Sequence, residues 1–201
     1  MSKLQDLIKE LCPNGVEFKK LGEVCVIEKG EQLNKTEMFK SGSFPVINGG
    51  VNPSGYLEKY NVLGNTITVS QGGASAGFVS WQQNNFWAGA HCYFLTVSDK
   101  VINRFIFHFL KSKEYKLKES QYGAGIPALS KDTLGSLIVP VPPLAVQQEI
   151  VRILDNFSAL TSDLTTDLSS ELTLRNKQYE FYRDDLLAPW KDTPVKELKD
   201  V

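Results

Sequence analysis

The sequence predicts an α+β protein, in which a mixed α/β globular domain is followed by one long α-helix. Three observations lead to this fold class. Short apolar runs broken by Gly, Asn and Ser fill residues 44–97, which is typical of a sheet of short strands. Residues 101–117 change to a helical apolar period. Residues 144–187 contain neither Gly nor Pro, and their apolar residues recur at helical spacing.

The elements of the globular domain can be assigned in chain order. Residues 2–11 are expected to form a short helix that Ser2 caps and the Pro-Asn-Gly at 13–15 ends. Residues 16–24 suggest a short extended or turn-like entry into the domain. Strands are expected at 44–47, 66–69, 77–81, 92–97 and 137–141, with turns at 48–50, 52–55 and 72–73 and a loop at 123–127.

The long helix carries an apolar stripe that its own domain is too small to cover. At about 1.5 Å per residue, residues 144–187 would span roughly 65 Å. The stripe advances in steps of three or four, apart from the adjacent pair Ile153 and Leu154 and one seven-residue step across Arg175. Its members are Ile150, Ile153, Leu154, Phe157, Leu160, Leu164, Leu168, Leu172, Tyr179, Tyr182 and Leu186. We expect a second chain to supply the partner helix, in a coiled-coil-like pair.

Charge and cysteine usage bound the function without deciding it. The net charge of −1 gives no whole-chain basic signature for nucleic acid. Residues 1–145 carry 15 Lys and Arg against 12 Asp and Glu, whereas residues 146–201 carry 7 against 11. Cys12, Cys25 and Cys92 form no CxxC pair, so neither a disulfide framework nor a zinc site is expected. We expect a cytoplasmic protein with no signal peptide and no membrane span.

Three motifs that could carry catalysis lack essential parts. Residues 52–56 approach the Asn-Pro-Pro-Tyr of adenine methyltransferases, but the spacing differs by one residue and no glycine-rich cofactor loop follows a strand. Residues 72–77 lack the Gly-Lys-Ser/Thr end of a Walker loop. The triplets at 17–19 and 114–116 lack the preceding Pro-Asp of a nuclease metal site. We expect no catalytic residue, no metal and no cofactor.

Reading bases requires side chains with paired donors and acceptors on exposed loops, and lysines can position a protein on phosphates. The candidate DNA-binding residues are Lys35, Asn48, Asn52, Tyr56, Gln71, Ser75, Gln82, Gln83, Asn84, His91, Lys113, Gln121 and Tyr122. Ordinary interpretations stand beside these. Residues 81–87 also fit a polar hairpin turn with buried aromatics, each lysine also fits a solvated surface, and His108 fits a structural histidine on an apolar helix face.

Four stretches together resemble a known family. These are residues 12–24 (CPNGVEFKKLGEV), residues 67–79 (ITVSQGGASAGFV) with WAGAH at 87–91, residues 126–130 (IPALS) leading to IVPVPPL at 138–144, and QQEIV at 147–151. In order and spacing they resemble the specificity subunits of type I restriction-modification systems, and the resemblance covers nearly the whole chain.

The resemblance implies an architecture and a set of partners. Members of that family have two target-recognition domains, each followed by a helical spacer, and the antiparallel spacers set the gap between two half-sites. This chain has one such unit: a recognition domain at 1–143, a spacer and dimerisation helix at 144–188, and a tail at 189–201. A homodimer on double-stranded DNA is implied, with methyltransferase subunits and restriction subunits as partners. S-adenosylmethionine would then bind the methyltransferase subunit, not this chain.

The tail and two rival functions complete the sequence analysis. Residues 195–201 repeat the pattern of residues 18–24, as expected where a second repeat begins after about 177 residues. One rival is an enzyme, such as an orphan DNA methyltransferase or a nuclease fragment. The other is a helical oligomerisation protein without a DNA function. DNA selection and a methyl-transfer assay distinguish the three.

Overall fold

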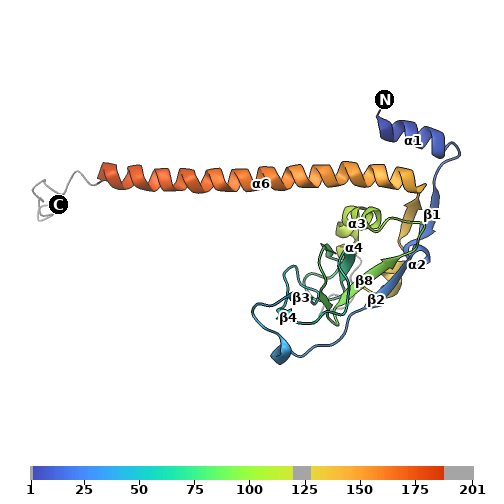
Figure 1. The fold of residues 1–201 in the computed structure, drawn as a ribbon, viewed down its shortest axis with the longest axis horizontal. Helices are drawn as coiled ribbons and strands as arrows, with labels where there is room; N and C mark the ends of the chain where they lie inside the picture. The colour runs from blue at the N-terminus through green and yellow to red at the C-terminus, as the bar shows by residue number, and fades with distance from the viewer. Residues whose placement is uncertain (1, 120–127, 188–201) are drawn as a thin grey trace, which may run out of the picture. The chain divides into compact units, whose positions relative to one another are not determined.

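The computed structural model describes residues 2–119 and 128–187, which form two compact units. We call the described residues up to Leu154 the head unit and those from Asp155 to Leu187 the spacer unit. The helices are α1 (Lys3–Leu11), α2 (Leu21–Val24), the 3-10 turn η1 (Lys35–Glu37), α3 (Asn103–Ser112), α4 (Glu114–Glu119), α5 (Lys131–Gly135) and α6 (Leu144–Leu187). The strands are β1 (Glu17–Lys20), β2 (Cys25–Lys29), β3 (Phe44–Ile47), β4 (Tyr56–Leu57), β5 (Thr66–Ser70), β6 (Val79–Gln82), β7 (Trp87–Ala88), β8 (Cys92–Val97) and β9 (Ile138–Val141). Figure 1 shows them along the chain.

The largest sheet of the head unit is antiparallel and four-stranded, in the order β2-β8-β5-β6. β8 lies between β2 and β5, and Leu95 sits opposite Ile27 on one side and Ile67 on the other. All three side chains are buried. Such β-branched and leucine pairs across neighbouring strands stabilise a sheet whose one face meets a core.

Two smaller sheets complete the head unit. β3 pairs antiparallel with β4 and parallel with β7. β1 pairs antiparallel with β9, with Lys20 opposite Ile138. The stretch expected to be a short extended or turn-like entry is the strand β1 followed by the one-turn helix α2. This pairing joins residues more than a hundred positions apart, which local sequence patterns do not encode.

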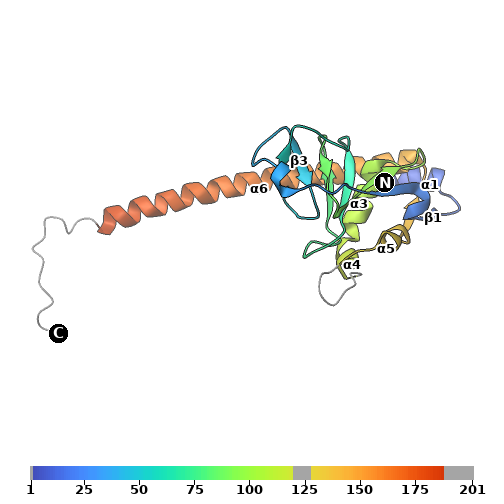
Figure 2. The same ribbon diagram turned by 90° about the horizontal axis from the view of Figure 1, so that it is seen from below.

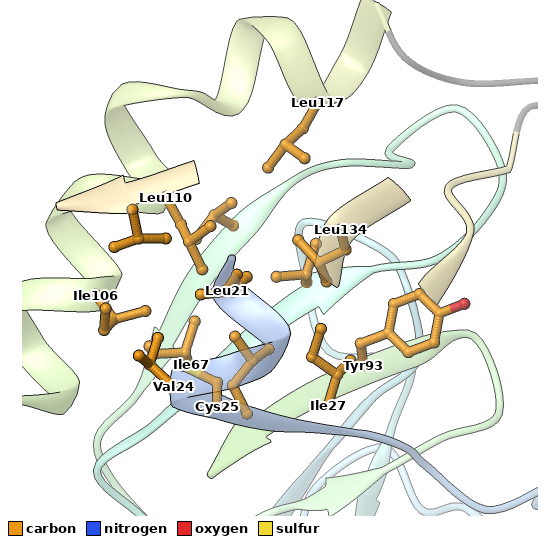
Figure 3. Close-up of a cluster of buried hydrophobic side chains, with 14 of the residues drawn as sticks. Leu21, Val24, Cys25, Ile27, Ile67, Tyr93, Ile106, Leu110, Leu117 and Leu134 are labelled. Atoms are coloured by element: carbon orange, nitrogen blue, oxygen red, sulfur yellow. The ribbon is translucent and has the colours of Figure 1, made fainter. Parts of the chain in front are cut away.

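The main core lies where α2, α3 and α4 meet the central sheet. In Figure 3, Ile106 and Leu110 of α3 lie on one side of Leu21, and Ile27 of β2 and Tyr93 of β8 lie on the other. Each of these five side chains is at most 4% exposed. Truncating a leucine or isoleucine in such a site to alanine costs about 2–5 kcal/mol, because a cavity remains.

The helix expected over residues 101–117 is in fact two helices, α3 and α4, that are separated at Lys113. Glu114, the first residue of α4, explains the break. Its carboxylate accepts the backbone N–H of Val79 at 3.1 Å and forms ion pairs with Lys111 and Lys118. Lys111 also donates to the carbonyl of Val79 at 3.0 Å. The helix junction is thus fixed to the first residue of β6.

Partial burial of Glu114 opposes ionisation of its carboxyl group. The hydrogen bonds from Lys111, Lys118 and the Val79 N–H outweigh that effect, so the pKa of Glu114 lies below its usual value. The junction between the two helices is consequently held by a charged carboxylate at neutral pH.

The first turns of α6 belong to the head unit and are held there by Gln147. This side chain is 0% exposed. Its Oε1 accepts the N–H of Ile102 at 2.8 Å, and its Nε2 donates to the carbonyls of Lys100 and Pro142 at 3.1 and 2.8 Å. One amide therefore satisfies three backbone groups that precede α3 and α6.

The N-terminal helix α1 is capped as expected and is tied to α6. Ser2 and Gln5 form a reciprocal capping box. Lys3 Nζ lies 3.1 Å from one oxygen of Glu149, and Arg152 Nη2 lies 2.7 Å from the other. The hydrogen bond from Arg152 is the largest influence on Glu149, and with the Lys3 contact it outweighs desolvation and lowers the pKa of Glu149 to about 2.

The spacer unit, taken by itself, is a single helix, so it has no second element to cover its side chains. Its serine and threonine hydroxyls bond within the helix: Thr161, Thr165 and Thr173 each donate to the carbonyl four residues earlier. Its large apolar side chains are exposed, by 63% at Phe157, 74% at Leu168 and 66% at Tyr179, for example. The expected uncovered stripe is present.

The α+β class and most of the expected elements are confirmed. The expected strands coincide with β3, β5, β6, β8 and β9 to within about two residues at either end, and the long helix spans the expected residues. The strands β2, β4 and β7 and the helix α5 were not expected. Figure 2 shows the same elements from below. The loop expected at 123–127 and the tail at 189–201 lie outside the described residues, and the boundary at residue 143 stays a prediction.

Candidate nucleic-acid interface

A polar groove of ≈ 850 Å³ on the head unit collects four of the candidate residues. Lys35 comes from η1, Asn48 from the turn after β3, Tyr56 from the start of β4, and His91 from the turn before β8. These segments are up to fifty-six positions apart in sequence. Asn52 lies in the exposed turn between Asn48 and Tyr56 but does not line the groove.

The side chain of Asn48 is oriented by the backbone around His91. Its Oδ1 accepts the N–H of His91 at 3.0 Å. Gly89 allows this close approach, because a Cβ at that residue would lie 2.5 Å from the same oxygen. Among the described residues, no hydrogen bond uses the Nδ2 of Asn48, so a donor remains for a ligand. A fixed amide with an available donor is the feature that base recognition needs.

The turn that begins directly after Asn48 is held by Ser70. Its Oγ donates to the carbonyl of Gly49 at 2.6 Å, and Gly49 has a φ of +82°. A Cβ at Gly49 would lie 2.8 Å from the carbonyl oxygen of His91. Only glycine fits this approach without strain. The β3–β4 turn and the turn before β8 are therefore locked together at the groove.

Gln71 lies beside this groove rather than in it. Its backbone N–H donates to the carbonyl of His91 at 2.9 Å, and its carbonyl accepts the N–H of Leu129 at 2.7 Å. The side-chain Oε1 is buried and has no hydrogen-bond partner among the described residues. Buried acceptors are normally paired, so the Oε1 of Gln71 is a hydrogen-bond acceptor next to His91 that is still available to a donor.

A second polar groove, of ≈ 650 Å³, holds Gln83 and Asn84. Both side chains are exposed. The groove is also lined by Asn65, whose φ is +55°, and by Asn85, whose Oδ1 accepts the N–H of Gly64 at 2.9 Å. Amide side chains thus gather here as well, on the loops that flank β5 and β6.

The remaining candidates are not brought to either groove. Gln82 is half-buried, and its Nε2 donates to Thr68 Oγ1 and Ser80 Oγ at 3.2 and 2.9 Å, which is a structural role within the sheet. Ser75 is half-buried in a turn, and Lys113 lies 5.7 Å from the ring centre of Phe109 at the end of α3. Gln121 and Tyr122 lie outside the described residues.

The aromatic residues of the 81–87 run are mostly buried. Phe86 is 0% and Trp87 8% exposed, while Trp81 is half-buried and lies under the guanidinium of Arg104, 4.8 Å from its ring centre. His108 is half-buried and lines an apolar groove. The ordinary interpretations of a hairpin with tucked aromatics and of a structural histidine fit these placements.

Sequence reasoning missed three polar residues that line the larger groove, Gln32, Asn34 and Ser54. Asn34 forms a capping box with Glu37 that fixes η1. The pattern Asn-x-x-Glu at 34–37 is a recognisable helix-start signal and could have located this turn. Nothing in the sequence around Gln32 marks it.

Metal and thiol chemistry have no support in the described part of the chain. Within residues 2–119 and 128–187, no cluster of three His, Cys, Asp or Glu side chains could hold a metal ion. Burial raises the pKa of Cys25 and of Cys92 to about 12, so both stay protonated. No helix in the same ranges is long and apolar enough to span a bilayer.

Known structures share this fold. A type I restriction-modification S subunit from Mycoplasma genitalium superimposes with a TM-score of 0.68 at 25% identity, over 89% of this chain and 50% of that one. The S subunit from Thermoanaerobacter tengcongensis matches with a TM-score of 0.60 at 21% identity, over 80% of this chain and 44% of that one. The fold class is accordingly the one found in type I S subunits: a mixed α/β head followed by a long helix.

Sequence comparisons agree with the fold. Residues 13–174 match the family model described as the type I restriction modification DNA specificity domain. A type I restriction enzyme specificity subunit of Haemophilus influenzae is 36% identical over 92% of this chain and 50% of its own length. A type I specificity subunit of Mycoplasma pneumoniae is 29% identical over 97% of this chain and 66% of its own. The chain belongs to the type I restriction-modification DNA specificity domain family, and it spans half to two thirds of these relatives.

Proposed function

We propose that this chain reads one half of a split DNA site as the specificity component of a type I restriction-modification system, and that it does so as a homodimer. The convergence of Lys35, Asn48, Tyr56 and His91 on one polar groove carries the first part of the proposal. The relatives are named as specificity subunits, and the matching family model is described as a DNA specificity domain, which supports a role in DNA recognition rather than in catalysis. Methyl transfer and cleavage then belong to partner subunits, and S-adenosylmethionine binds there.

The residues of the groove fit distinct roles on a duplex. Lys35 and Lys40 line it and are exposed, so they suit phosphate contacts that fix the register without reading sequence. Asn48 offers an oriented amide donor, and His91 is exposed beside it. Amides commonly read adenine, through paired contacts to its N6 and N7. Gln83 and Asn84 offer a second set of amides on other loops of the head unit.

The apolar stripe of α6 supports the dimer. Ile150, Ile153, Leu154, Phe157, Leu160, Leu164, Leu168, Leu172 and Tyr179 are proposed to contact a second copy. The six of these that lie in the spacer unit, among them Leu164 and Leu168, are all more than half exposed. A stripe of this length is stable in water only when it is covered. A two-fold dimer would present two equal reading heads to a two-fold related split site.

The domain limits and the partners complete the proposal. The recognition domain is residues 1–143, the spacer helix is residues 144–188, and the tail from 189 begins a repeat. Methyltransferase subunits dock on the spacer pair, and restriction subunits join that complex. The assembly works in the cytoplasm, where its DNA substrate lies.

Selection of bound DNA tests the proposal directly. The purified chain, with and without its methyltransferase partner, is incubated with duplexes that carry a randomised core, and the retained fraction is sequenced. We expect a split motif with two equivalent halves around a fixed gap. Enrichment of no motif by the assembled complex, or of an undivided one, would contradict it.

A matched pair of amide variants tests whether the selected motif depends on the larger groove. Asn48→Ala removes the oriented amide of the larger groove and should relax selection at one base position per half-site. Gln82→Ala removes an amide whose Nε2 is already used within the sheet and should leave the motif unchanged. Transfer of labelled methyl groups by the chain alone would instead support the rival enzyme.

A further inference from the structure

The larger groove of the head unit has an apolar side as well as a polar one. Its apolar lining consists of the side chains of Leu33, Met38, Phe39 and Pro53. The amides and lysines described above belong to the polar side. A groove that combines amides, lysines and apolar side chains suits a ligand that carries polar and apolar groups next to each other.

The apolar side is fixed by the core beneath it. Leu33 is 9% exposed and forms a buried cluster that includes Leu57 and Trp87, and Met38 packs against this cluster. A Cβ at Gly55 would lie 2.8 Å from the Cβ of Met38, so Met38 lies directly against the backbone before β4. Side chains held in this way lose little freedom when a ligand binds, which favours affinity.

Phe39 is the large side chain of this apolar lining that faces solvent. It is 59% exposed. Its backbone is held by two hydrogen bonds with Tyr56: the N–H of Phe39 donates to the carbonyl of Tyr56 at 2.9 Å, and the N–H of Tyr56 donates to the carbonyl of Phe39 at 3.0 Å. The groove therefore contains an uncovered phenyl ring on a fixed backbone.

The strand pairing places Phe39 and Asn48 on opposite sides of β4. Tyr56 of β4 pairs with Pro45 of β3 on one edge and with Phe39 on the other. Neighbouring strands lie about 4.8 Å apart, so the backbones of Pro45 and Phe39 are about 10 Å apart. Asn48 follows the end of β3, and both Asn48 and Phe39 line the groove. The groove thus runs across β4, from an amide on one side to a phenyl ring on the other.

The charge of the groove fits a nucleic acid. Lys35 and Lys40 line it and lie on either side of Phe39 in the sequence, and none of the described residues in its lining is Asp or Glu. A groove of this charge attracts the phosphate backbone of a duplex. Phosphate contacts by the two lysines would bring the ring of Phe39 towards the base edges.

An A·T base pair divides its polar and apolar groups in the same way. In the major groove it presents the N7 and N6 of adenine and, towards the other side, the O4 and the C5-methyl group of thymine. Phenylalanine is one of the side chains that contact this methyl group in protein–DNA complexes. The Oδ1 of Asn48 accepts the N–H of His91 and keeps a second lone pair, so the amide can still pair with both N6 and N7.

We propose that Phe39 is a specificity-determining residue that contacts the C5-methyl group of a thymine, in the base pair whose adenine is read by Asn48. The proposal rests on the proposed function and adds to it the identity of one base pair in each half-site. Met38 lines the same side of the groove and helps to exclude water from the methyl group. The free energy of burying one such group corresponds to about fourfold in affinity.

Single replacements of thymine by deoxyuridine test the proposal, because uracil pairs as thymine does but lacks the C5-methyl group. The duplex selected by the assembled complex is synthesised with one thymine of one half-site replaced at a time. The dissociation constant of the assembled complex is then measured by fluorescence anisotropy. One position should lose about fourfold in affinity. That position should be the base pair at which Asn48→Ala relaxes selection.

Variants of Phe39 assign the methyl contact to this side chain. With Phe39→Ala, the thymine and uracil duplexes should bind with nearly equal affinity. Phe39→Leu keeps an apolar side chain and should retain a preference for thymine of about twofold or more. Phe18 gives the matched control, because it is the same residue type, is 64% exposed in β1 and lines neither polar groove. Phe18→Ala should keep the full preference for thymine.

The outcomes separate this contact from the proposed function. A selected half-site without an A·T pair, or a uracil effect that persists in Phe39→Ala, would overturn the thymine contact and leave the reading of a split site standing. A loss in Phe39→Ala that is equal for both duplexes would also overturn it, because a wedge between base steps behaves in that way. Selection of no split motif would overturn both. A uracil penalty that disappears in Phe39→Ala and remains in Phe39→Leu and Phe18→Ala supports the proposal.

Discussion

Replacing Gln147 should be the most damaging single change in the first turns of α6. Gln147→Met keeps nearly the same length and volume but removes an amide that serves three backbone groups. The N–H of Ile102 and the carbonyls of Lys100 and Pro142 then lose their partner. A buried polar group left unpaired costs about 1–3 kcal/mol. Lys100 is exposed, so water can replace one of the three contacts.

The expected loss is therefore about 3–5 kcal/mol, two unpaired groups plus a part of the third. Urea unfolding followed by the fluorescence of Trp81 and Trp87, both in the head unit, measures it. Protein concentrations must be equal in all samples, because a dimer gains apparent stability with concentration.

Gln148 provides the control for this experiment. It is exposed and adjacent, and none of the hydrogen bonds described above involves it. Gln148→Met should change the unfolding free energy by less than about 0.5 kcal/mol. If the two methionine variants differ by less than 1 kcal/mol, the inference that one amide fixes the start of α6 to the head is wrong.

Four further predictions follow from the structure. The pKa of Glu149 is about 2, below its ordinary value of 4.5, so its contribution to stability is present above pH 4.5 and is lost as the pH falls through 2. Between pH 4.5 and 2, the urea midpoint of the wild type should therefore fall more steeply than the midpoint of Glu149→Gln. Gly89→Ala should push a Cβ against Asn48 Oδ1 and weaken DNA binding by about tenfold or more in a gel shift. Gly22→Ala, in α2 away from the groove, adds a Cβ whose nearest contact is an ordinary 3.5 Å, and it should leave DNA binding nearly unchanged. Lys35→Ala should weaken binding to all duplexes alike and lower the salt slope of affinity by about one; a change in sequence preference instead would assign Lys35 to base reading. Replacing Leu160, Leu164 and Leu168 together by Asp should give monomers in analytical ultracentrifugation, and a persistent dimer would exclude the spacer-helix interface.

Much of the fold was predictable because its signals are local. The capping box at Ser2 and the period of residues 144–187 depend on neighbours within one or two helical turns. The strands missed were those whose identity depends on distant partners. β7 is only Trp87–Ala88 and pairs with β3, and β2 became a strand through its full pairing with β8. The break at Lys113 depends on the contact of Glu114 with Val79, thirty-five positions away.

The candidate site was predictable in residue type but not in grouping. Amides, lysines and aromatics on loops gave the list, and Lys35, Asn48, Tyr56 and His91 share a groove. Gln82 looked equally suitable, yet it lies at the end of β6 and its amide donates to Thr68 and Ser80 within the sheet. A sequence shows which side chains can bind bases; strand register decides which of them remain available.

The pairing of β1 with β9 has a consequence for how the molecule can change. The segment between Leu21 and Leu137 is inserted between the strands β1 and β9, and the two residues that flank it, Lys20 and Ile138, are paired with each other. A different reading domain could be grafted between these two residues without moving the helices on either side. Under the proposed function, this arrangement would let one recognition domain be exchanged for another as a unit, while β1, β9 and α6 are kept.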